Sequence, residues 1–431
     1  MMRWMLVLIC GALVLCQTAF GAEVLFAITP DRSNAVYRCG EKATFTVSVC
    51  DSNNHAVTSG VLRVTFTRDG YELVSSNSFD MSSTSAPITV SGTLGSPGFL
   101  HCTAALTGDR WPRFLSSWSS AGFDPDKIQP ATKFPSDFRE WWDNERKKLF
   151  SVPLDIQLEN INAISGEYAS GYRISVASAN GERVHGFLGV PSGKAGKTNF
   201  PALVLFPGYG GGFSGPSMGT AQTGYLTLWL NVHKYPVPAN SEKAMSAFKD
   251  YDKNLASKSY LLEGRENPDK YHFYTIFLGF DRAIDYLLSR PEWDQKNLIV
   301  EGASQGGWLA LVMAGMKNDK VTAAVAQVPF MGDLERKYWH SGTSLNNGLI
   351  EKGSMTIPYY AGVNFARFIK CPVIVSVGYR DGSCYPASVY AVYNVIPSAD
   401  KKLYAHPQAG HGLLPEDHEA KAAFMKKWIG K

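Results

Sequence analysis

Ser304 stands in the pattern Gly-x-Ser-x-Gly, which suits a nucleophilic serine on a sharp turn between a strand and a helix. A short apolar run at residues 298–301 leads into the pattern, and a helix-forming run follows it at once. Such a turn lifts the serine hydroxyl above the sheet and leaves no room for a Cβ at Gly302 and Gly306. The pattern predicts nucleophilic attack on a carbonyl carbon, and a glycine-rich turn with an incidental serine is the alternative.

Asp381 is the candidate for the acid that must orient a catalytic base. In folds built around this turn, the acid and then the base follow the serine along the chain. Asp381 comes just after an apolar run at residues 373–378, which predicts a strand, so it lies at that strand's carboxyl end. The alternative is a turn-forming aspartate, because Asp-Gly is a common turn and Gly382 comes next.

His411 is the candidate base. It lies between two glycines on the loop that follows the next predicted strand, where an imidazole can be held over the sheet. His406 and His418 compete for the role. His406 stands at the strand end beside a proline, and His418 falls in a predicted helix among acidic residues, where a solvated face is the simpler interpretation.

Two backbone N–H groups are candidates for stabilising the oxyanion that such an attack creates. One belongs to Gln305, at the start of the new helix, and the other to Tyr209, in a glycine-rich loop after the apolar run at residues 202–206. A phosphate-binding loop is the alternative for this glycine run, but it lacks the Gly-Lys-Ser/Thr ending. No Cys-x-x-Cys or His/Cys spacing suggests a metal, so the sequence predicts neither a metal nor a cofactor.

The composition describes a globular protein of two or three domains. The chain has 431 residues, of which 45% are hydrophobic and 19% charged, so it can bury a large core. The net charge is +4 and no basic run stands out, which argues against nucleic acid as a partner.

Residues 1–21 have the features of a secretory signal peptide: Arg3, an apolar stretch and a small-x-small cleavage site. An N-terminal membrane anchor is the alternative, but the apolar stretch is shorter than the ~20 residues that a span requires. We therefore expect an exported protein, secreted or periplasmic, without a membrane span in the mature chain.

Residues 22–107 read as an all-β domain. Apolar and polar residues alternate at 44–49 and 62–67, and turn-forming clusters separate these runs. Short strands at this spacing predict an immunoglobulin-like sandwich. A disulfide between two of Cys39, Cys50 and Cys102 is compatible with export, and the sequence leaves the pairing open.

Residues 108–133, rich in proline and polar residues, are expected to form a connector that few contacts cross. From residue 134 to the end, apolar strands alternate with helical runs, the clearest at 274–288, 305–316 and 415–429. This order predicts an α/β domain, a doubly wound and mostly parallel sheet whose ligands bind at the carboxyl ends of the strands.

Within this second domain the chain resembles acetyl xylan esterases and cephalosporin C deacetylases, serine carbohydrate esterases with the α/β-hydrolase fold. The resemblance covers about 300 residues and is clearest in the segments FDRAIDYL (280–287), GASQGG (302–307), VPFMGD (328–333), NFA (364–366), KCPV (370–373) and GYRDGSCYP (378–386). It implies Ser304 as nucleophile, Asp381 as acid, His411 as base, and Tyr209 and Gln305 as oxyanion donors.

The chain departs from the family pattern in three places. His-Lys-Tyr stands at 233–235 where the family usually has Arg-Gly-Gln, Gly412 replaces a glutamate, and Pro207 replaces a histidine. The N-terminal domain also lies outside the usual single-domain pattern. The resemblance implies an acylated carbohydrate substrate. A glucuronoyl or feruloyl esterase and an inactive carbohydrate-binding relative are the alternatives, and an oligomer is compatible with the sequence.

Overall fold

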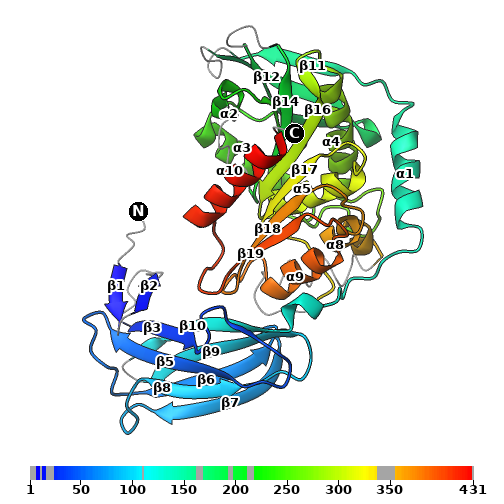
Figure 1. Ribbon diagram of the computed structural model, residues 1–431. Coiled ribbons are helices and arrows are strands. Elements are labelled where there is room, and N and C mark those ends of the chain that lie inside the picture. Colours follow the sequence, from blue (N-terminus) through cyan, green and yellow to red (C-terminus); the bar gives the residue numbers. More distant parts are fainter. Residues whose placement is uncertain are drawn as a thin grey trace.

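The computed structural model describes residues 6–9, 12–15, 24–108, 111–161, 168–192, 198–210, 218–336 and 355–429. Two domains follow one another along the chain (Figure 1). The N-terminal domain is all-β, and the second domain is built on one large sheet covered by helices. None of the helices in these residues is long and apolar enough to cross a bilayer.

The N-terminal domain consists of a five-stranded and a three-stranded sheet that share one core. The sheets have the orders β4-β10-β9-β6-β7 and β3-β5-β8. Alternate side chains point into the space between them, where the Phe45 and Phe66 rings lie 5.6 Å apart. The immunoglobulin-like topology stays a prediction. The strands are β3 (Val24–Pro30), β4 (Val36–Tyr37), β5 (Ala43–Asp51), β6 (Val61–Arg68), β7 (Glu72–Asp80), β8 (Ile88–Gly92), β9 (Gly98–Gly108) and β10 (Trp111–Phe123).

Strand β10 corrects the expected connector at residues 108–133. The strand pairs with β9 in an antiparallel ladder and with β4 in a parallel one, so it is an inner strand of the N-terminal sheet. Its run of serines carries little of the apolar alternation that marks strands, although Ser119 and Ser120 are fully buried. Backbone pairing on both sides holds this strand, and that pairing leaves no periodic sequence signal.

No disulfide joins any two of the described residues Cys39, Cys50 and Cys102, a possibility that the sequence left open. Among the described residues all five cysteines, Cys39, Cys50, Cys102, Cys371 and Cys384, are thiols. The structure shows two short antiparallel strands, β1 (Leu6–Ile9) and β2 (Ala12–Leu15), within the first 21 residues, whose role as a signal peptide stays a prediction.

The second domain contains a nine-stranded mixed sheet with the order β11-β12-β13-β15-β14-β16-β17-β18-β19. Strands β14 to β19 run parallel to one another. Each of β11, β12 and β13 is antiparallel to the strands beside it. The expected mostly parallel sheet is thus confirmed. The strands are β11 (Ile156–Asn160), β12 (Ala169–Ala177), β13 (Arg183–Pro191), β14 (Phe200–Phe206), β15 (Leu226–Leu230), β16 (Trp293–Ala303), β17 (Ala323–Gln327), β18 (Val373–Gly378) and β19 (Lys401–His406).

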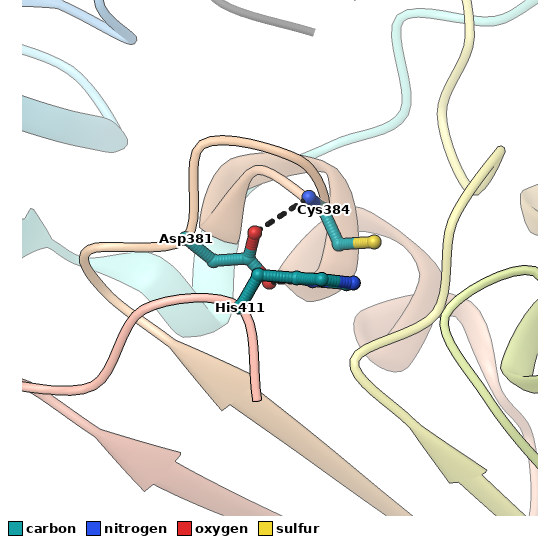
Figure 2. A group of neighbouring side chains, drawn as sticks. All are labelled: Asp381, Cys384 and His411. Atoms are coloured by element: carbon teal, nitrogen blue, oxygen red, sulfur yellow. Dashed lines mark hydrogen bonds and ion pairs between the residues drawn. The ribbon is translucent and has the colours of Figure 1, made fainter. Parts of the chain in front are cut away.

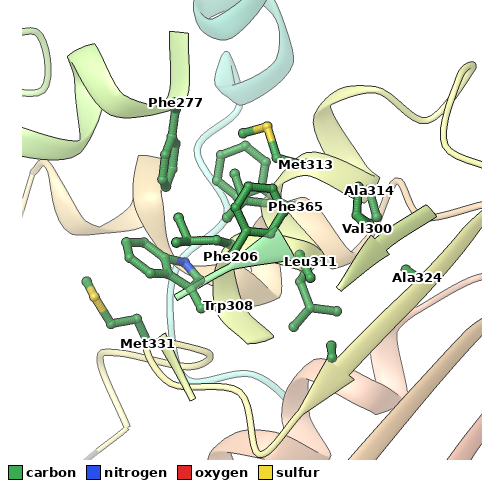
Figure 3. Close-up of a cluster of buried hydrophobic side chains, with 14 of the residues drawn as sticks. Phe206, Phe277, Val300, Trp308, Leu311, Met313, Ala314, Ala324, Met331 and Phe365 are labelled. Atoms are coloured by element: carbon green, nitrogen blue, oxygen red, sulfur yellow. The ribbon is translucent and has the colours of Figure 1, made fainter. Parts of the chain in front are cut away.

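Helices cover both faces of this sheet. Neighbouring residues of one strand serve opposite faces: Val300 packs in the large cluster with α4 and α5, and Ile299 packs with Phe424 of α10. The large cluster centres on Trp308, which is fully buried (Figure 3). Burying a large apolar side chain of this kind contributes roughly 1.5–3 kcal/mol. The α-helices are α1 (Phe138–Leu149), α2 (Met218–Gln222), α3 (Ser241–Asn254), α4 (His272–Ser289), α5 (Gln305–Met316), α7 (Ile357–Tyr360), α8 (Gly362–Ala366), α9 (Pro386–Val395) and α10 (Pro415–Ile429).

The two domains are in close contact, and the prediction that few contacts cross between them is wrong. The Asp333 carboxylate accepts the backbone N–H of Thr132 at 2.7 Å, which ties the segment after β10 to the second domain. Arg336 is ion-paired both with Asp333, at 2.9 Å, and with Asp69 of the N-terminal domain, at 3.5 Å. The side chains of Asp69, Asp333 and Arg336 are largely buried, and they pair across the domain boundary. No local sequence pattern predicts such a pairing.

Candidate active site

Ser304 forms a sharp turn between β16 and α5. Its backbone has φ 58° and ψ −121°, a conformation that costs energy for a residue with a Cβ and marks functional turns. A Cβ on Gly302 would lie 2.3 Å from Gly306, and one on Gly306 would lie 2.3 Å from the carbonyl oxygen of Phe206. The expected need for glycine at both positions is therefore confirmed, and its cause is backbone approaching backbone.

Asp381 and His411 form a hydrogen-bonded pair on the loops that follow β18 and β19. Asp381 Oδ2 lies 2.9 Å from His411 Nδ1. The other carboxylate oxygen accepts the backbone N–H groups of Ser383 and Cys384, both at 2.8 Å. The Asp381 side chain is fully buried, whereas 36% of the His411 side chain is exposed. The carboxylate is thus held by the backbone and can orient a ring that still reaches solvent.

The hydrogen bond that His411 donates to the Asp381 carboxylate raises the pKa of His411 above its ordinary value, because it favours the protonated ring; partial burial acts in the opposite direction. With Nδ1 bonded to Asp381, the far nitrogen, Nε2, is the atom left to exchange a proton with a substrate or a nucleophile.

Cys384 is near both this pair and Ser304. The Ser304 hydroxyl oxygen is 3.9 Å from Cys384 Sγ, and atoms of Asp381, Cys384 and His411 lie within 4.8 Å of one another. Figure 2 shows the Cys384 sulfur and the outer edge of the His411 ring on the same side of Asp381. Within the described residues, Ser304 and His411 share no direct hydrogen bond, and such bonds are often long before substrate binds.

A carboxylate, a thiol and an imidazole at this separation resemble a set of metal ligands. Both Asp381 oxygens, however, already accept hydrogen bonds, and burial raises the pKa of the Cys384 thiol well above its ordinary value. The group fits a relay of hydrogen bonds better than a cation site.

The competing histidines lie elsewhere. His406 Nε2 is bonded to Asp417 Oδ1 at 2.8 Å, so it forms a second histidine–aspartate pair that links β19 to α10. His418 is exposed on α10. Of the three candidates, His411 is the one bonded to Asp381. Asp381 in turn accepts the backbone N–H of Cys384, whose sulfur lies near the Ser304 hydroxyl.

The loops carrying Tyr209 and Gln305 meet beside the turn. A Cβ on Gly208 would lie 3.9 Å from the carbonyl oxygen of Ala303, and Gly208 lines the same cavity as Ser304. Tyr209 is 57% exposed, and its ring stacks on that of Tyr260 with 5.6 Å between the ring centroids.

Tyr260 was not indicated by any sequence pattern, yet it connects the two oxyanion candidates. Its buried hydroxyl donates to Gln305 Oε1 at 2.6 Å and accepts the N–H of Gly210, the residue after Tyr209. His233 contacts the same loop, with its Nε2 3.3 Å from the Gly210 carbonyl oxygen. Burial lowers the pKa of His233 to about 4, so the ring is neutral and donates from Nε2.

A cavity of about 1000 Å³ opens beside Ser304 between the sheet and α10. Its walls are mostly apolar, with Trp229 and Leu413 among them, and they include an ion pair of Glu301 with Lys421 at 2.6 Å. The volume exceeds what an acetyl group fills, so the site has space for the larger part of an ester.

Comparisons with known proteins agree on one family. The sequence profile of the acetyl xylan esterase (AXE1) family matches residues 126–428. The acetyl esterase Axe7A of Xylanibacter ruminicola is 30% identical over 423 residues, which cover 95% of this chain and 92% of that protein. The alignment with Axe7A therefore includes most of the N-terminal domain, whereas the family profile matches only the residues after it.

Solved structures show the same fold. The acetyl xylan esterase from Paenibacillus sp. R4 has a TM-score of 0.60 at 24% identity, covering 71% of this chain and 98% of its own. Acetyl xylan esterase 1 from Thermoanaerobacterium sp. JW/SL YS485 has a TM-score of 0.59 at 24% identity, with 70% and 97% covered. The chain therefore belongs to the acetyl xylan esterase family, and it is a carboxylic ester hydrolase with an α/β-hydrolase-like fold.

Proposed function

We propose that the protein is an exported serine esterase that removes acetyl, or another short acyl group, from plant-type polysaccharide or oligosaccharide. The observation that carries the proposal is the strained turn at Ser304 beside the Asp381–His411 pair. Family membership supports an acylated carbohydrate as the substrate. The apolar residues within 1–21 support export.

In this proposal the reaction begins with proton transfer from Ser304 to Nε2 of His411. The serine oxygen then attacks the ester carbonyl, and the negative charge that develops on the carbonyl oxygen is held by the N–H groups of Tyr209 and Gln305. Asp381 stabilises the imidazolium, because its Oδ2 already accepts the Nδ1 hydrogen.

Collapse of this intermediate breaks the bond to the sugar oxygen, which takes its proton from His411 and leaves as a free hydroxyl. Water then attacks the acyl-enzyme with His411 acting as base, which releases the acid and restores Ser304. We assign the cavity beside Ser304 to the sugar portion of the ester, because it is too large for an acetyl group alone.

The proposal is tested by incubating the full chain with acetylated, feruloylated and glucuronoylated oligosaccharides and identifying the acids released. Chromogenic acetate and butyrate esters measure chain-length preference. We expect acetate to be released fastest. Release of ferulate or glucuronate without release of acetate would show that the substrate is a feruloyl or glucuronoyl ester and not an acetyl ester. Binding without any hydrolysis would indicate an inactive carbohydrate-binding relative.

The pH profile of kcat/KM should report His411. Protonated His411 cannot accept the serine proton, so activity should fall as the pH decreases through the His411 pKa. Because the hydrogen bond to the Asp381 carboxylate raises that pKa, the midpoint of the acid limb should lie above the ordinary value of about 6.5. A midpoint well below 6.5 in a steady-state titration would contradict the assignment of the base.

Tyr260→Phe should lower kcat about tenfold and change KM little. The substitution removes the hydroxyl that ties the Gly210 loop to Gln305, so the two N–H donors lose their mutual alignment. Loss of a whole donor costs roughly 10²–10³ in kcat, and a residue that only positions donors should cost less.

Tyr271→Phe is the matched control, since Tyr271 is also buried and donates its hydroxyl to a backbone oxygen, that of Leu261, at 2.9 Å. Tyr271→Phe should lose about 1 kcal/mol of stability for its one missing hydrogen bond, and Tyr260→Phe about twice as much for its two. Equal kcat values for the two variants would reduce Tyr260 to a structural residue.

A further inference from the structure

Two residues of β9 face the second domain and not the core of their own. Leu100 and Cys102 point into the N-terminal core, and the alternation of the strand turns Phe99 and His101 to the opposite face. Phe99 is fully buried and belongs to the hydrophobic cluster of the second domain. Its ring lies 4.9 Å from Tyr379 in an edge-on contact and 5.6 Å from Tyr390.

These contacts converge on the loop that carries Asp381, residues 379–385, which we call the acid loop. Besides Phe99 against Tyr379, the Arg380 guanidinium donates to Ser117 Oγ of β10 at 3.2 Å. At the other end of the loop, the Tyr385 hydroxyl lies 3.4 Å from Nδ1 of His101. The N-terminal domain thus contacts the acid loop on both sides of Asp381.

The surface that meets the acid loop is itself held rigidly. The backbone N–H and the carbonyl oxygen of Phe99 are both bonded to Asp69, each at 2.8 Å. The second Asp69 oxygen faces Arg336 of the second domain at 3.5 Å. Phe99 therefore has a fixed backbone and a fixed ring position relative to Tyr379.

We propose that the N-terminal domain positions the catalytic acid: through Phe99, with His101 and Ser117, it fixes the acid loop so that Asp381 stays aligned with His411. Inside the second domain this loop is irregular. Besides the Asp381–His411 bond, two backbone bonds link it to the segment that carries the histidine: Tyr379 N–H to the His406 oxygen at 3.0 Å and Arg380 N–H to the Ala409 oxygen at 2.9 Å. A shift of Tyr379 or Arg380 would strain these two bonds and displace Asp381 relative to His411. This inference rests on the proposed function of Asp381 and His411, and it adds the N-terminal domain as the part of the chain that positions Asp381.

The test compares Phe99→Ala and Phe99→Leu with wild type in the full chain, using soluble acetate esters. We expect kcat to fall roughly 10- to 100-fold in Phe99→Ala and less in Phe99→Leu, because small misplacements of a reacting group have effects of this size. KM should change little. The acid limb of the pH profile should move to lower pH. Asp381 and Cys384 are the titratable groups beside the His411 ring among the described residues, and a weakened Asp381 bond no longer raises the His411 pKa.

Phe66→Leu provides the matched control, because Phe66 is equally buried but packs on Phe45 inside the N-terminal core. It should lower the melting temperature without moving the acid limb. A folded Phe99→Ala protein with the kcat and pH profile of wild type would overturn the proposal. If Phe99→Ala does not fold, a Phe99→Leu protein with the wild-type profile would overturn it equally. Hydrolysis that persists in Ser304→Ala would instead refute the proposed function, so the two failures are distinguishable.

Discussion

Replacing Ser304 by alanine is expected to lower kcat roughly 10⁴-fold or more, because the proposed acyl-enzyme forms on the oxygen that this substitution removes. The remaining rate would come from the oxyanion donors and from substrate binding alone. The fold should persist. Alanine has the same Cβ as serine at φ 58°, and the backbone bonds of residue 304 to Gln327 and Phe330, at 2.9 and 3.0 Å, do not use the hydroxyl.

Ser178→Ala is the control for loss of a buried serine hydroxyl. Ser178 Oγ donates to the carbonyl oxygen of Thr275 at 2.7 Å, far from Ser304 along the chain, so its loss should cost about 1 kcal/mol of stability and leave kcat unchanged. Both proteins would be compared with wild type by circular dichroism and by turnover of an acetate ester. Turnover near the wild-type rate in folded Ser304→Ala would refute the nucleophile.

The turn at Ser304 could be predicted because a steric rule connects sequence to geometry there. Gly302 and Gly306 are required by backbone contacts only 2.3 Å from where a Cβ would lie, so the pattern itself encodes the turn. The pairing of Asp381 with His411 was predictable for a related reason. Parallel strands end at one edge of the sheet, and Asp381 and His411 follow two adjacent strands of that edge.

Other parts of the site depend on contacts that leave no periodic signal. Tyr260 lies 45 residues before Gln305 in sequence, and only the folded chain brings its hydroxyl to that side chain. Cys384 looked like one of five unremarkable cysteines, although its backbone N–H and its sulfur both reach proposed catalytic residues.

The domain boundary was misjudged for a physical reason of the same kind. Strand β10 is held by hydrogen bonds to two neighbours, and its serines gave no apolar alternation. Phe99 reads in the sequence as one apolar residue in an apolar strand, and only the position of the second domain shows that its ring packs outward. Charges buried across the boundary, such as Asp69 and Arg336, are likewise invisible until their partners are known.

Asp381→Asn is expected to lower kcat by roughly 10³- to 10⁴-fold without unfolding the protein. The two carboxylate oxygens have different partners: one accepts the N–H groups of Ser383 and Cys384, and the other faces His411 Nδ1. In asparagine the amide oxygen would keep the two backbone donors, which leaves the amide NH₂ facing the ring. His411 Nδ1 must then accept a hydrogen bond, so its proton moves to Nε2, and Nε2 can no longer take a proton from Ser304.

The structure offers a closely matched control in the second histidine–aspartate pair. Asp417 holds His406 at 2.8 Å with one oxygen and accepts the N–H of Leu414 at 2.9 Å with the other, so Asp417→Asn makes the same chemical change in a similar setting. It should cost about 1 kcal/mol of stability and leave kcat within about twofold of wild type. The measurement is kcat for both variants on one acetate ester, with folding checked by melting temperature. Loss of activity in Asp417→Asn together with an active Asp381→Asn protein would transfer the roles of acid and base to Asp417 and His406. His406 ends β19 and Asp417 lies on α10, whereas Asp381 accepts the N–H of Cys384, whose sulfur is 3.9 Å from the Ser304 hydroxyl oxygen. The position of Ser304 therefore favours the pair of Asp381 with His411.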